Sequence, residues 1–231
     1  MIRLAVTIGN ISISSYFLML ALGTVGMFMC AYARRQKFGI ETWQCAALIV
    51  LLTFIGVVGA MLLFFLENGS FGGVSFYGSV FLIPILMSVA GLPFRLKPTQ
   101  TLDICGPCVA IMIGCMRFNC FLSGCCGGNE FFIGMTCITW PTQAIDSICD
   151  FVILFWLLHL ENQGKAAGKL YPLFMIFYSI MRFFLEFLRD TEKDWLLLSH
   201  GQWFSIVAIV LGTSWMYYCR KKLISQSSNV D

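Results

Sequence analysis

Charged residues are scarce in this chain, and their scarcity excludes a soluble globular domain. Only 12% of the 231 residues are Asp, Glu, Lys or Arg, while 58% are hydrophobic. A soluble domain carries about 25% charged residues. The mean hydropathy of +0.82 agrees with this low charge content. The composition therefore predicts an integral membrane protein.

Long polar segments are also lacking, so there is no room for a soluble domain. We predict an all-α bundle of seven transmembrane helices, each close to the about 17–25 residues that cross a bilayer. The predicted spans are 14–33, 45–66, 75–93, 101–122, 141–160, 170–188 and 202–219. Because the connections between them are short, residues 1–231 should form one integral membrane domain.

Histidine is nearly absent, with two residues in the chain, and this weighs against a metal site. The spacing Cys105-x-x-Cys108 suits zinc or redox chemistry, but the segment is membranous and no paired histidine follows. We therefore expect no metal and no cofactor. Most of the 11 cysteines lie within spans, where a cysteine is a small apolar residue. The sequence leaves open whether a disulfide forms among the outward-facing cysteines Cys120, Cys125, Cys126 and Cys137.

The distribution of basic residues predicts the orientation, because inner loops of membrane proteins are enriched in Lys and Arg. With the N-terminus outside, the inner segments hold Arg34, Arg35, Lys37, Arg95, Lys97, Lys165, Lys169, Arg220, Lys221 and Lys222. The outer segments hold Arg3, Arg189 and Lys193. We therefore place the C-terminus inside. The net charge of +3 comes from these inner basic residues, which would lie beside anionic lipid. It does not indicate binding to nucleic acid.

A cleaved signal peptide is not expected at the N-terminus. The positive charges of a signal peptide precede its apolar run. Here the basic cluster at 33–37 follows the first apolar run instead of preceding it.

The sixth span carries charge where a membrane helix normally has none. Arg182 and Glu186 lie inside the apolar run 170–188, and Arg189 follows it. At roughly 100° per residue, these three and Tyr178 fall on one helical stripe about 80° wide. A charged side chain at the centre of a membrane helix costs roughly 2.5–3.5 kcal/mol on insertion scales. The stripe should therefore face a protein interior and a substrate path.

Other polar residues converge at the outer ends of the predicted spans, which places a site in the outer half of the bilayer. They are Tyr16, Glu67, Asn68, Ser75, Tyr77, Arg117, Gln143, His200 and Gln202. Arg117 lies about five residues, or roughly 8 Å, below the outer end of its span. Guanidinium groups bind phosphate through paired hydrogen bonds, so Arg117 and Arg182 could stabilise charge on a departing phosphate. Glu186, one turn from Arg182, would hold that guanidinium in place.

A simple ion pair between Arg182 and Glu186 is the alternative interpretation. This interpretation does not explain Arg117, which has no acidic residue one turn away on its own helix. Asp103 is too far along that helix and is expected to cap the N-terminus of the fourth span. Asp146 and Asp150 could face the same cavity or pair with Arg189.

The segment Arg117-Phe-Asn-Cys-Phe-Leu-Ser-Gly-Cys-Cys-Gly-Gly128 resembles the signature of the prolipoprotein diacylglyceryl transferase family. The surrounding motifs resemble the family in the same order: Ser15-Tyr16, residues 72–78, Trp140-Pro-Thr-Gln143, Tyr178-x-x-x-Arg182-x-x-x-Glu186 and Gly201-Gln202. The resemblance covers residues 10–219.

The resemblance implies an enzyme of the outer face of the bacterial cytoplasmic (inner) membrane. Such an enzyme transfers diacylglyceryl from phosphatidylglycerol to the lipobox cysteine thiol of a prolipoprotein. Its partners would be phosphatidylglycerol, prolipoprotein signal peptides and the bilayer. The candidate catalytic residues are Arg117, Arg182, Glu186 and Tyr77. The candidate substrate-binding residues are Tyr16, Tyr178, Arg189, Gln143, Gln202, Gly124 and Ser75.

This chain also departs from the pattern that it resembles. Tyr77 stands where well-known members carry a histidine that could act as a general base, and tyrosine, with a pKa of about 10, is a poor base. Cys120 and Ser123 stand where many members have Asn. Three alternatives stay open: a transferase with another acceptor, a non-catalytic lipid-binding or lipid-flipping relative, and a thiol-redox protein built on its cysteines.

Overall fold

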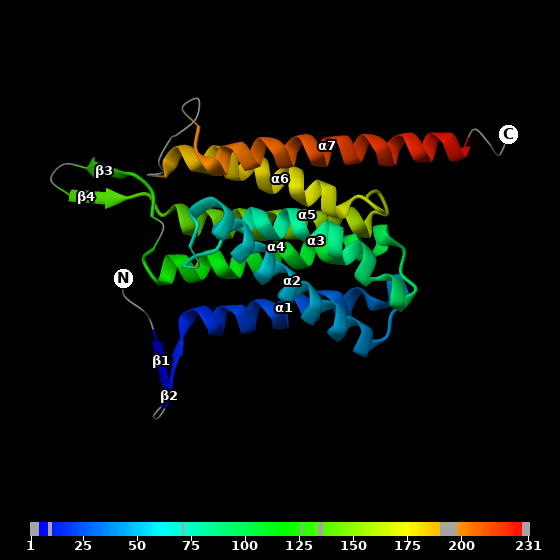
Figure 1. Cartoon of the computed structure of the whole chain (residues 1–231), viewed down its shortest axis with the longest axis horizontal. Coiled ribbons are helices and arrows are strands. Elements are labelled where there is room, and N and C mark those ends of the chain that lie inside the picture. The colour runs from blue at the N-terminus through cyan, green and yellow to red at the C-terminus, as the bar shows by residue number, and fades with distance from the viewer. Residues whose placement is uncertain are drawn as a thin grey trace.

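The computed structural model describes residues 5–8, 11–70, 72–125, 127–133, 136–189 and 198–227. Within them, seven α-helices lie side by side along the long axis of the molecule (Figure 1). They are α1 (Ser15–Phe38), α2 (Thr42–Asn68), α3 (Phe76–Ala90), α4 (Pro98–Leu122), α5 (Thr142–Asn162), α6 (Leu170–Leu185) and α7 (His200–Ser227). Each predicted span coincides with one of these helices, so the predicted helical bundle is confirmed.

Five helical segments of the described chain are long and apolar enough to cross a membrane: α1, α2, α4, α5, and α6 extended to Leu188 by the 3-10 turn η2 (Glu186–Leu188). Helix α3 is apolar but has 15 residues. A second 3-10 turn, η1 (Leu92–Phe94), follows α3. The chain is therefore a helical polytopic membrane protein.

Two short β-hairpins, which the hydropathy pattern did not predict, extend from one end of the bundle (Figure 1). Strand β1 (Ala5–Ile8) pairs antiparallel with β2 (Ile11–Ser14), with Ala5 opposite Ser14. Strand β3 (Glu130–Ile133) pairs with β4 (Thr136–Thr139), with Glu130 opposite Thr139. Both hairpins lie at the end of the bundle opposite the C-terminus. They directly precede α1 and α5.

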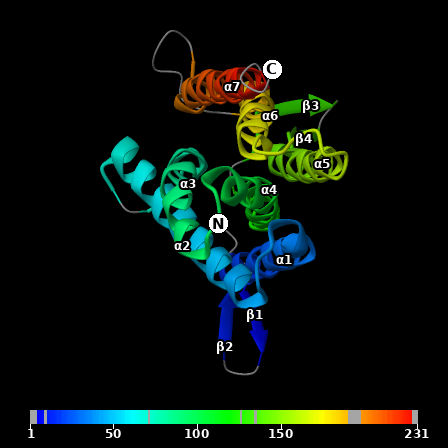
Figure 2. The same ribbon diagram turned by 90° about the vertical axis from the view of Figure 1, so that its right-hand side faces the viewer.

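Helix α4 is the central helix of the bundle. It packs against α1, α3, α5 and α6, and Figure 2 shows it enclosed by them. Small residues such as Cys108, Ala110 and Gly114 allow this close packing, and all three are buried. Because Arg117 lies on this central helix, its side chain is buried within the protein.

Helices α2 and α3 cross where two glycines meet. A Cβ atom added to Gly59 would lie 2.8 Å from the carbonyl oxygen of Gly78, and a Cβ on Gly78 would overlap the Gly59 carbonyl. Small residues allow this close backbone approach in membrane proteins. Gly59 and Gly78 therefore form the contact at which α2 and α3 cross.

The end of the bundle opposite the hairpins holds a buried ion pair that the sequence did not predict. Arg34 of α1 donates to both carboxylate oxygens of Glu161 on α5, at 2.7 and 2.8 Å. Its terminal nitrogens also reach the backbone carbonyls of Asp103 and Ile104 on α4. One side chain therefore fastens three helices together.

The expectation that Asp103 caps its own helix was wrong. Helix α4 begins five residues earlier, at Pro98. The Asp103 carboxylate instead accepts hydrogen bonds from the backbone N–H groups of Gly168 and Leu170. These groups belong to the start of α6, whose first turn leaves backbone donors without helical partners. Asp103 thus caps a neighbouring helix through a tertiary contact.

Candidate active site

Arg117 and Arg182 meet at a single carboxylate, that of Asp146. The Nε atom of Arg117 on α4 lies 3.4 Å from Asp146 Oδ2, and a terminal nitrogen of Arg182 on α6 lies 3.3 Å from the same oxygen. All three residues are buried. Three helices thus bring together two arginines that are 65 positions apart in the sequence. Asp146, which the sequence left ambiguous, therefore faces both arginines.

Glu186 holds the other side of Arg182. Its Oε2 lies 3.0 Å from Arg182, so the predicted pair one helical turn apart is present. Its Oε1 accepts a hydrogen bond from Ser199 Oγ at 3.1 Å. A Cβ on Gly201 would lie 3.1 Å from that same oxygen, so glycine leaves room for the carboxylate at the start of α7. The N-terminal end of a helix carries partial positive charge and favours an anion there.

Gln202 completes the start of α7. The backbone N–H of Ser199 donates to Gln202 Oε1 at 3.0 Å, and the backbone N–H of Gln202 donates to Ser199 Oγ at 3.3 Å. This reciprocal arrangement is a capping box. Gln202 therefore fixes the helix end that faces Glu186, and its side-chain carbonyl is used in doing so.

The predicted helical stripe is wrong at Arg189. The α-helix ends at Leu185, residues 186–188 tighten into a 3-10 turn, and Arg189 is extended, with φ −103° and ψ 145°. Arg189 therefore does not lie on the helical stripe, and its backbone forms a β-bridge with Gly128. The stripe holds for Tyr178 and Arg182, which are both buried.

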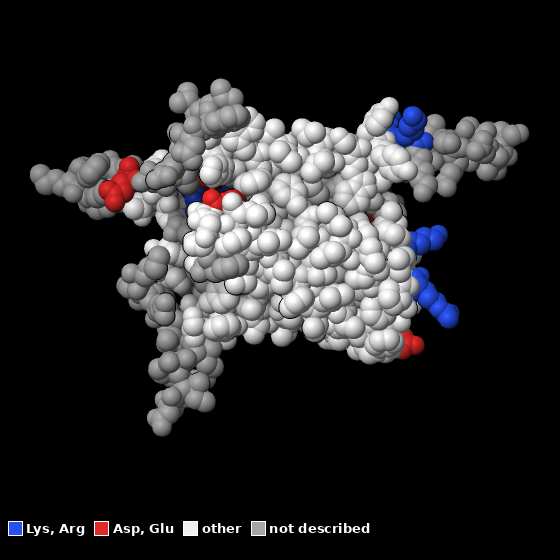
Figure 3. Space-filling model, viewed as in Figure 1, with Lys and Arg blue, Asp and Glu red and all other residues white. Residues whose placement is uncertain are grey.

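Several buried polar atoms around the arginines have no hydrogen-bond partner among the described residues. They include Asp146 Oδ1, both carboxylate oxygens of Asp150, the Tyr178 hydroxyl and Asn119 Oδ1. Buried polar groups are nearly always hydrogen-bonded, since an unpaired one costs roughly 1–3 kcal/mol. The site therefore offers both donors and acceptors to a polar ligand. Figure 3 shows charged atoms in a recess at the hairpin end of the molecule.

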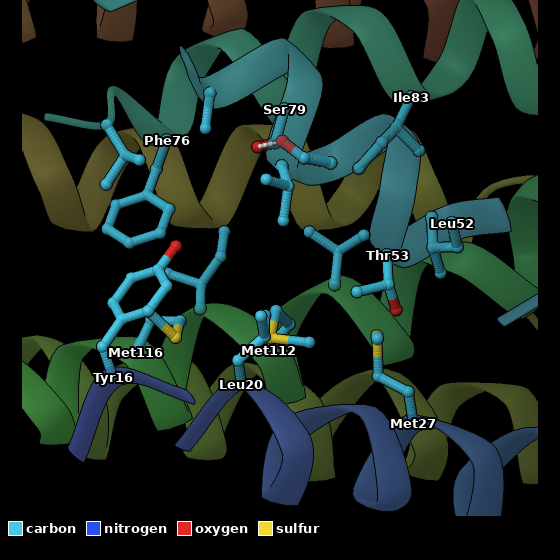
Figure 4. A pocket seen from close by; sticks show the side chains of 16 residues that line it. Tyr16, Leu20, Met27, Leu52, Thr53, Phe76, Ser79, Ile83, Met112 and Met116 are labelled. Carbon is cyan, nitrogen blue, oxygen red and sulfur yellow. Dashed lines mark hydrogen bonds between the residues drawn. The ribbon is translucent and has the colours of Figure 1, made fainter. Parts of the chain in front are cut away.

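An apolar cavity begins beside Arg117. The Arg117 guanidinium lies over the ring of Phe76, 4.7 Å from its centre, and Phe76 also lines the cavity. Figure 4 shows Phe76 and Tyr16 together at one end of the cavity and Met27 and Leu52 toward the other. The cavity lies between α1, α2, α3 and α4. Its lining is almost wholly apolar, which suits a hydrocarbon chain.

Tyr77 of α3 is buried between α6 and α7. Its hydroxyl lies 2.6 Å from Ser205 Oγ on α7, and Ser205 itself donates to the Gly201 carbonyl at 2.7 Å. The Tyr77 ring packs against the rings of Tyr178 and Phe204, with centres 5.7 and 5.9 Å away. Tyr77 is therefore anchored by α7, and its ring supports Tyr178.

Comparison with known proteins identifies the family of the chain. Residues 3–218 match the family described as prolipoprotein diacylglyceryl transferase. This chain belongs to that family.

Bacterial members of the transferase family resemble the chain over most of its length. Phosphatidylglycerol–prolipoprotein diacylglyceryl transferase 2 of Clostridium perfringens (strain 13 / Type A) is 28% identical over 229 residues, which cover 88% of this chain and 90% of the relative. The transferase of Clostridium tetani (strain Massachusetts / E88) is 26% identical over 88% of this chain and 92% of the relative. That of Nitrosomonas europaea is 25% identical over 93% and 88%. The resemblance expected from the motifs is confirmed.

The transferase signature segment forms the end of α4 and the loop after it. Gly124 ends the helix with φ +62°, a conformation that favours glycine. The Gln143 amide donates to the Cys125 carbonyl at 2.5 Å and so ties this loop to α5. Ser75 precedes α3 and donates to Glu67 at 3.3 Å. The side chains of Cys126 and Cys137 lie outside the described residues, so the question of a disulfide among the outer cysteines stays open.

Asp146 is the residue of the site that the sequence reasoning left ambiguous. The usable signal was its spacing, because Gln143, Asp146 and Asp150 follow each other at three and four residues and therefore share one helix face. Asp150 faces α4, since a Cβ on Gly114 would lie 3.4 Å from Asp150 Cβ. Phe76 gave no signal in the sequence at all.

Proposed function

We propose that this protein transfers the diacylglyceryl group of phosphatidylglycerol to the lipobox cysteine thiol of a prolipoprotein. The observation that carries the proposal is the joining of two buried arginines, Arg117 and Arg182, at the end of an apolar cavity. Together they match the two parts of a phospholipid, an anionic phosphate and its hydrocarbon chains. The relatives' names supply the two substrates.

The arginines would bind the phosphate and stabilise its developing charge. Guanidinium groups bind phosphate oxygens in paired geometry, and a preorganised cation is most effective where water is excluded. The acceptor thiolate would form a bond from sulfur to the glyceryl carbon. The bond from that carbon to the phosphate oxygen would break, and its electron pair would leave with glycerol phosphate. The proton of the thiol would pass to water at the outer face.

The other candidate residues would shape the pocket around this centre. Glu186 would orient Arg182, and Tyr77 would act by supporting Tyr178. The remaining predicted substrate contacts are Tyr16, Tyr178, Arg189, Gln143, Gln202, Gly124 and Ser75. An acyl chain of the lipid would lie in the cavity between Phe76 and Met27, directly beside the Arg117 guanidinium.

The same proposal includes the topology. All seven helices would cross the bacterial cytoplasmic membrane as one domain, with the hairpins and the arginine centre toward the outer face. Lys and Arg side chains visible in Figure 3 gather at the opposite end of the molecule, as expected for the inner side. Arg117 and Asp146 both lie within about five residues of the hairpin ends of α4 and α5.

The test is transfer by purified protein in vesicles of phosphatidylglycerol with a synthetic lipobox peptide. We expect thioether-linked peptide and glycerol phosphate in equal amounts, and neither product when phosphatidylethanolamine replaces phosphatidylglycerol. Arg117→Ala should lower the rate by at least about 100-fold, the size expected when a group that stabilises transition-state charge is removed. Arg220→Ala, which changes an exposed arginine of α7, is the matched control and should be as fast as wild type. Binding of phosphatidylglycerol without any product would reject the transferase and favour a lipid-binding protein.

A further inference from the structure

The ion pairs that Asp146 makes with the two arginines differ from a structural ion pair in the same bundle. Glu161 binds Arg34 through both carboxylate oxygens at 2.7 and 2.8 Å. Asp146 uses one oxygen for both arginines, at 3.3 and 3.4 Å, and its other oxygen has no partner among the described residues. Charge-assisted hydrogen bonds are normally about 2.7–2.9 Å long. The contacts of Asp146 are therefore long, few and open to exchange.

Asp146 also lies where an anionic ligand of the arginines would have to bind. A carboxylate and a phosphate bind guanidinium groups through the same kind of oxygen contact. Oδ2 of Asp146 is the oxygen shared by Arg117 and Arg182, and the carboxylate is only 2% exposed. A phosphate that bound both arginines would therefore displace this oxygen.

The charge balance of the site points the same way. Arg117 and Arg182 pair with Asp146 and Glu186, and Asp150 lies one turn from Asp146 on α5, so the arginines have counter-ions before any ligand binds. Glu186 is fixed by Ser199 and by the start of α7. Among the described residues, the hydrogen bond from Arg182 is the only one that the Asp146 carboxylate accepts. Of the two acids, Asp146 is the one that can give up its arginines.

We propose that Asp146 is an internal counter-ion that competes with the lipid phosphate for Arg117 and Arg182. It stabilises the two buried arginines before lipid binds, it yields to the phosphate, and it returns to displace glycerol phosphate after transfer. This role rests on the proposed transferase function. It makes Asp146 a positioning residue, which sets the affinity of the arginine pair and the rate of product release.

The test compares Asp146→Asn with wild type in the vesicle assay and in direct binding of glycerol phosphate to the purified protein. Without the competing charge, we expect glycerol phosphate to bind about tenfold more tightly, the value of one charge-assisted hydrogen bond. The KM for phosphatidylglycerol and kcat should both fall, because product leaves slowly. Asp146→Glu keeps the charge and should restore wild-type binding within about threefold. Should the Asn variant fail to fold, Asp146→Ser removes the same charge.

Glu161→Gln is the control for the general loss of a buried ion pair. It should lower the melting temperature but leave glycerol phosphate binding and the ratio of KM to kcat unchanged. Weaker or unchanged glycerol phosphate binding in a folded Asp146→Asn protein would overturn the proposal and leave Asp146 a structural residue. The binding arm is independent of turnover. A wild type without transfer activity would therefore reject the proposed function, while tighter binding by the Asn variant would still support the counter-ion.

Discussion

Arg34, Arg117 and Arg182 are all buried, yet different contacts fix them. Arg34 is held by a two-oxygen pair with Glu161 and by two backbone carbonyls. Arg117 has one long ion pair and the ring of Phe76. Arg34 is therefore a structural residue, and Arg117 keeps hydrogen-bonding capacity for a ligand.

Replacement of Arg34 by Leu should destabilise the protein without changing its specificity. The change leaves Glu161, whose side chain is 11% exposed, with the more distant Lys37 at 3.7 Å as its counter-ion, so the cost should stay below the about 3–5 kcal/mol of a fully buried pair that loses one partner. Thermal unfolding in detergent should show a clearly lower melting temperature. The KM of the protein that remains folded should equal that of wild type. Arg35→Leu on the same helix is the control, and an equal loss of stability there would contradict the assignment.

The Tyr77 hydroxyl should contribute little to the reaction. It is buried and bonded to Ser205, so Tyr77→Phe removes one hydrogen bond worth about 1 kcal/mol. We expect the Phe variant to keep more than about a tenth of the wild-type rate, and Ser205→Ala to behave similarly. A loss beyond 100-fold in Tyr77→Phe alone, on the order expected for a general base, would place the hydroxyl in the chemistry.

At the scale of elements, the start of α7 determines the position of Glu186 and through it that of Arg182. Gly201→Ala would add a Cβ 3.1 Å from Glu186 Oε1 and 3.2 Å from Cδ. The carboxylate would have to move, which should reduce transfer by about tenfold or more, since small misplacements of catalytic groups are costly. Ser214→Ala on the same helix should have no effect. Full activity of the Gly201 variant would show that the position of Glu186 is not required.

The cavity between α1, α2, α3 and α4 gives a second prediction at this scale. Gly56 faces it with free space, since its nearest neighbours would be 3.8 Å or more from an added Cβ. Gly56→Leu should therefore fill part of the cavity and reduce transfer from long-chain phosphatidylglycerol, while a short-chain lipid such as dioctanoyl phosphatidylglycerol is still used. Val50→Leu, on the exposed face of α2, is the control. Equal loss with both lipids would show that no acyl chain occupies this cavity.

The elements themselves were largely predictable, because each helix is an apolar run that needs no knowledge of its neighbours. The contacts between elements were not. The partners of Arg117 and Asp103 come from other helices. The 3-10 turn Glu186–Leu188 is followed directly by Arg189, which pairs with Gly128. The hairpins were missed because strands of four residues leave little trace in a hydropathy pattern.

At the scale of the whole molecule, the two ends of the bundle hold different clusters of charged side chains. The end near Arg34 is closed by ion pairs and helix caps, while the hairpin end contains the arginine centre. The proposed orientation predicts that alkaline phosphatase fused within residues 127–133 is active, since that loop faces outward. Phosphatase fused within 163–168 should be inactive and green fluorescent protein there should fluoresce. The reverse pattern would invert the orientation and place the site at the inner face.

The central claim is that Arg182 belongs to the phosphate site of a working transferase. The most direct measurement is complementation of a bacterial strain depleted of its own prolipoprotein diacylglyceryl transferase, read as lipidation of a reporter prolipoprotein. Wild type, Arg182→Ala and Arg220→Ala are compared at equal expression. We predict lipidation by wild type and by Arg220→Ala, and none by Arg182→Ala. Lipidation by Arg182→Ala at the wild-type level, or none by a well-expressed wild type, would contradict the account.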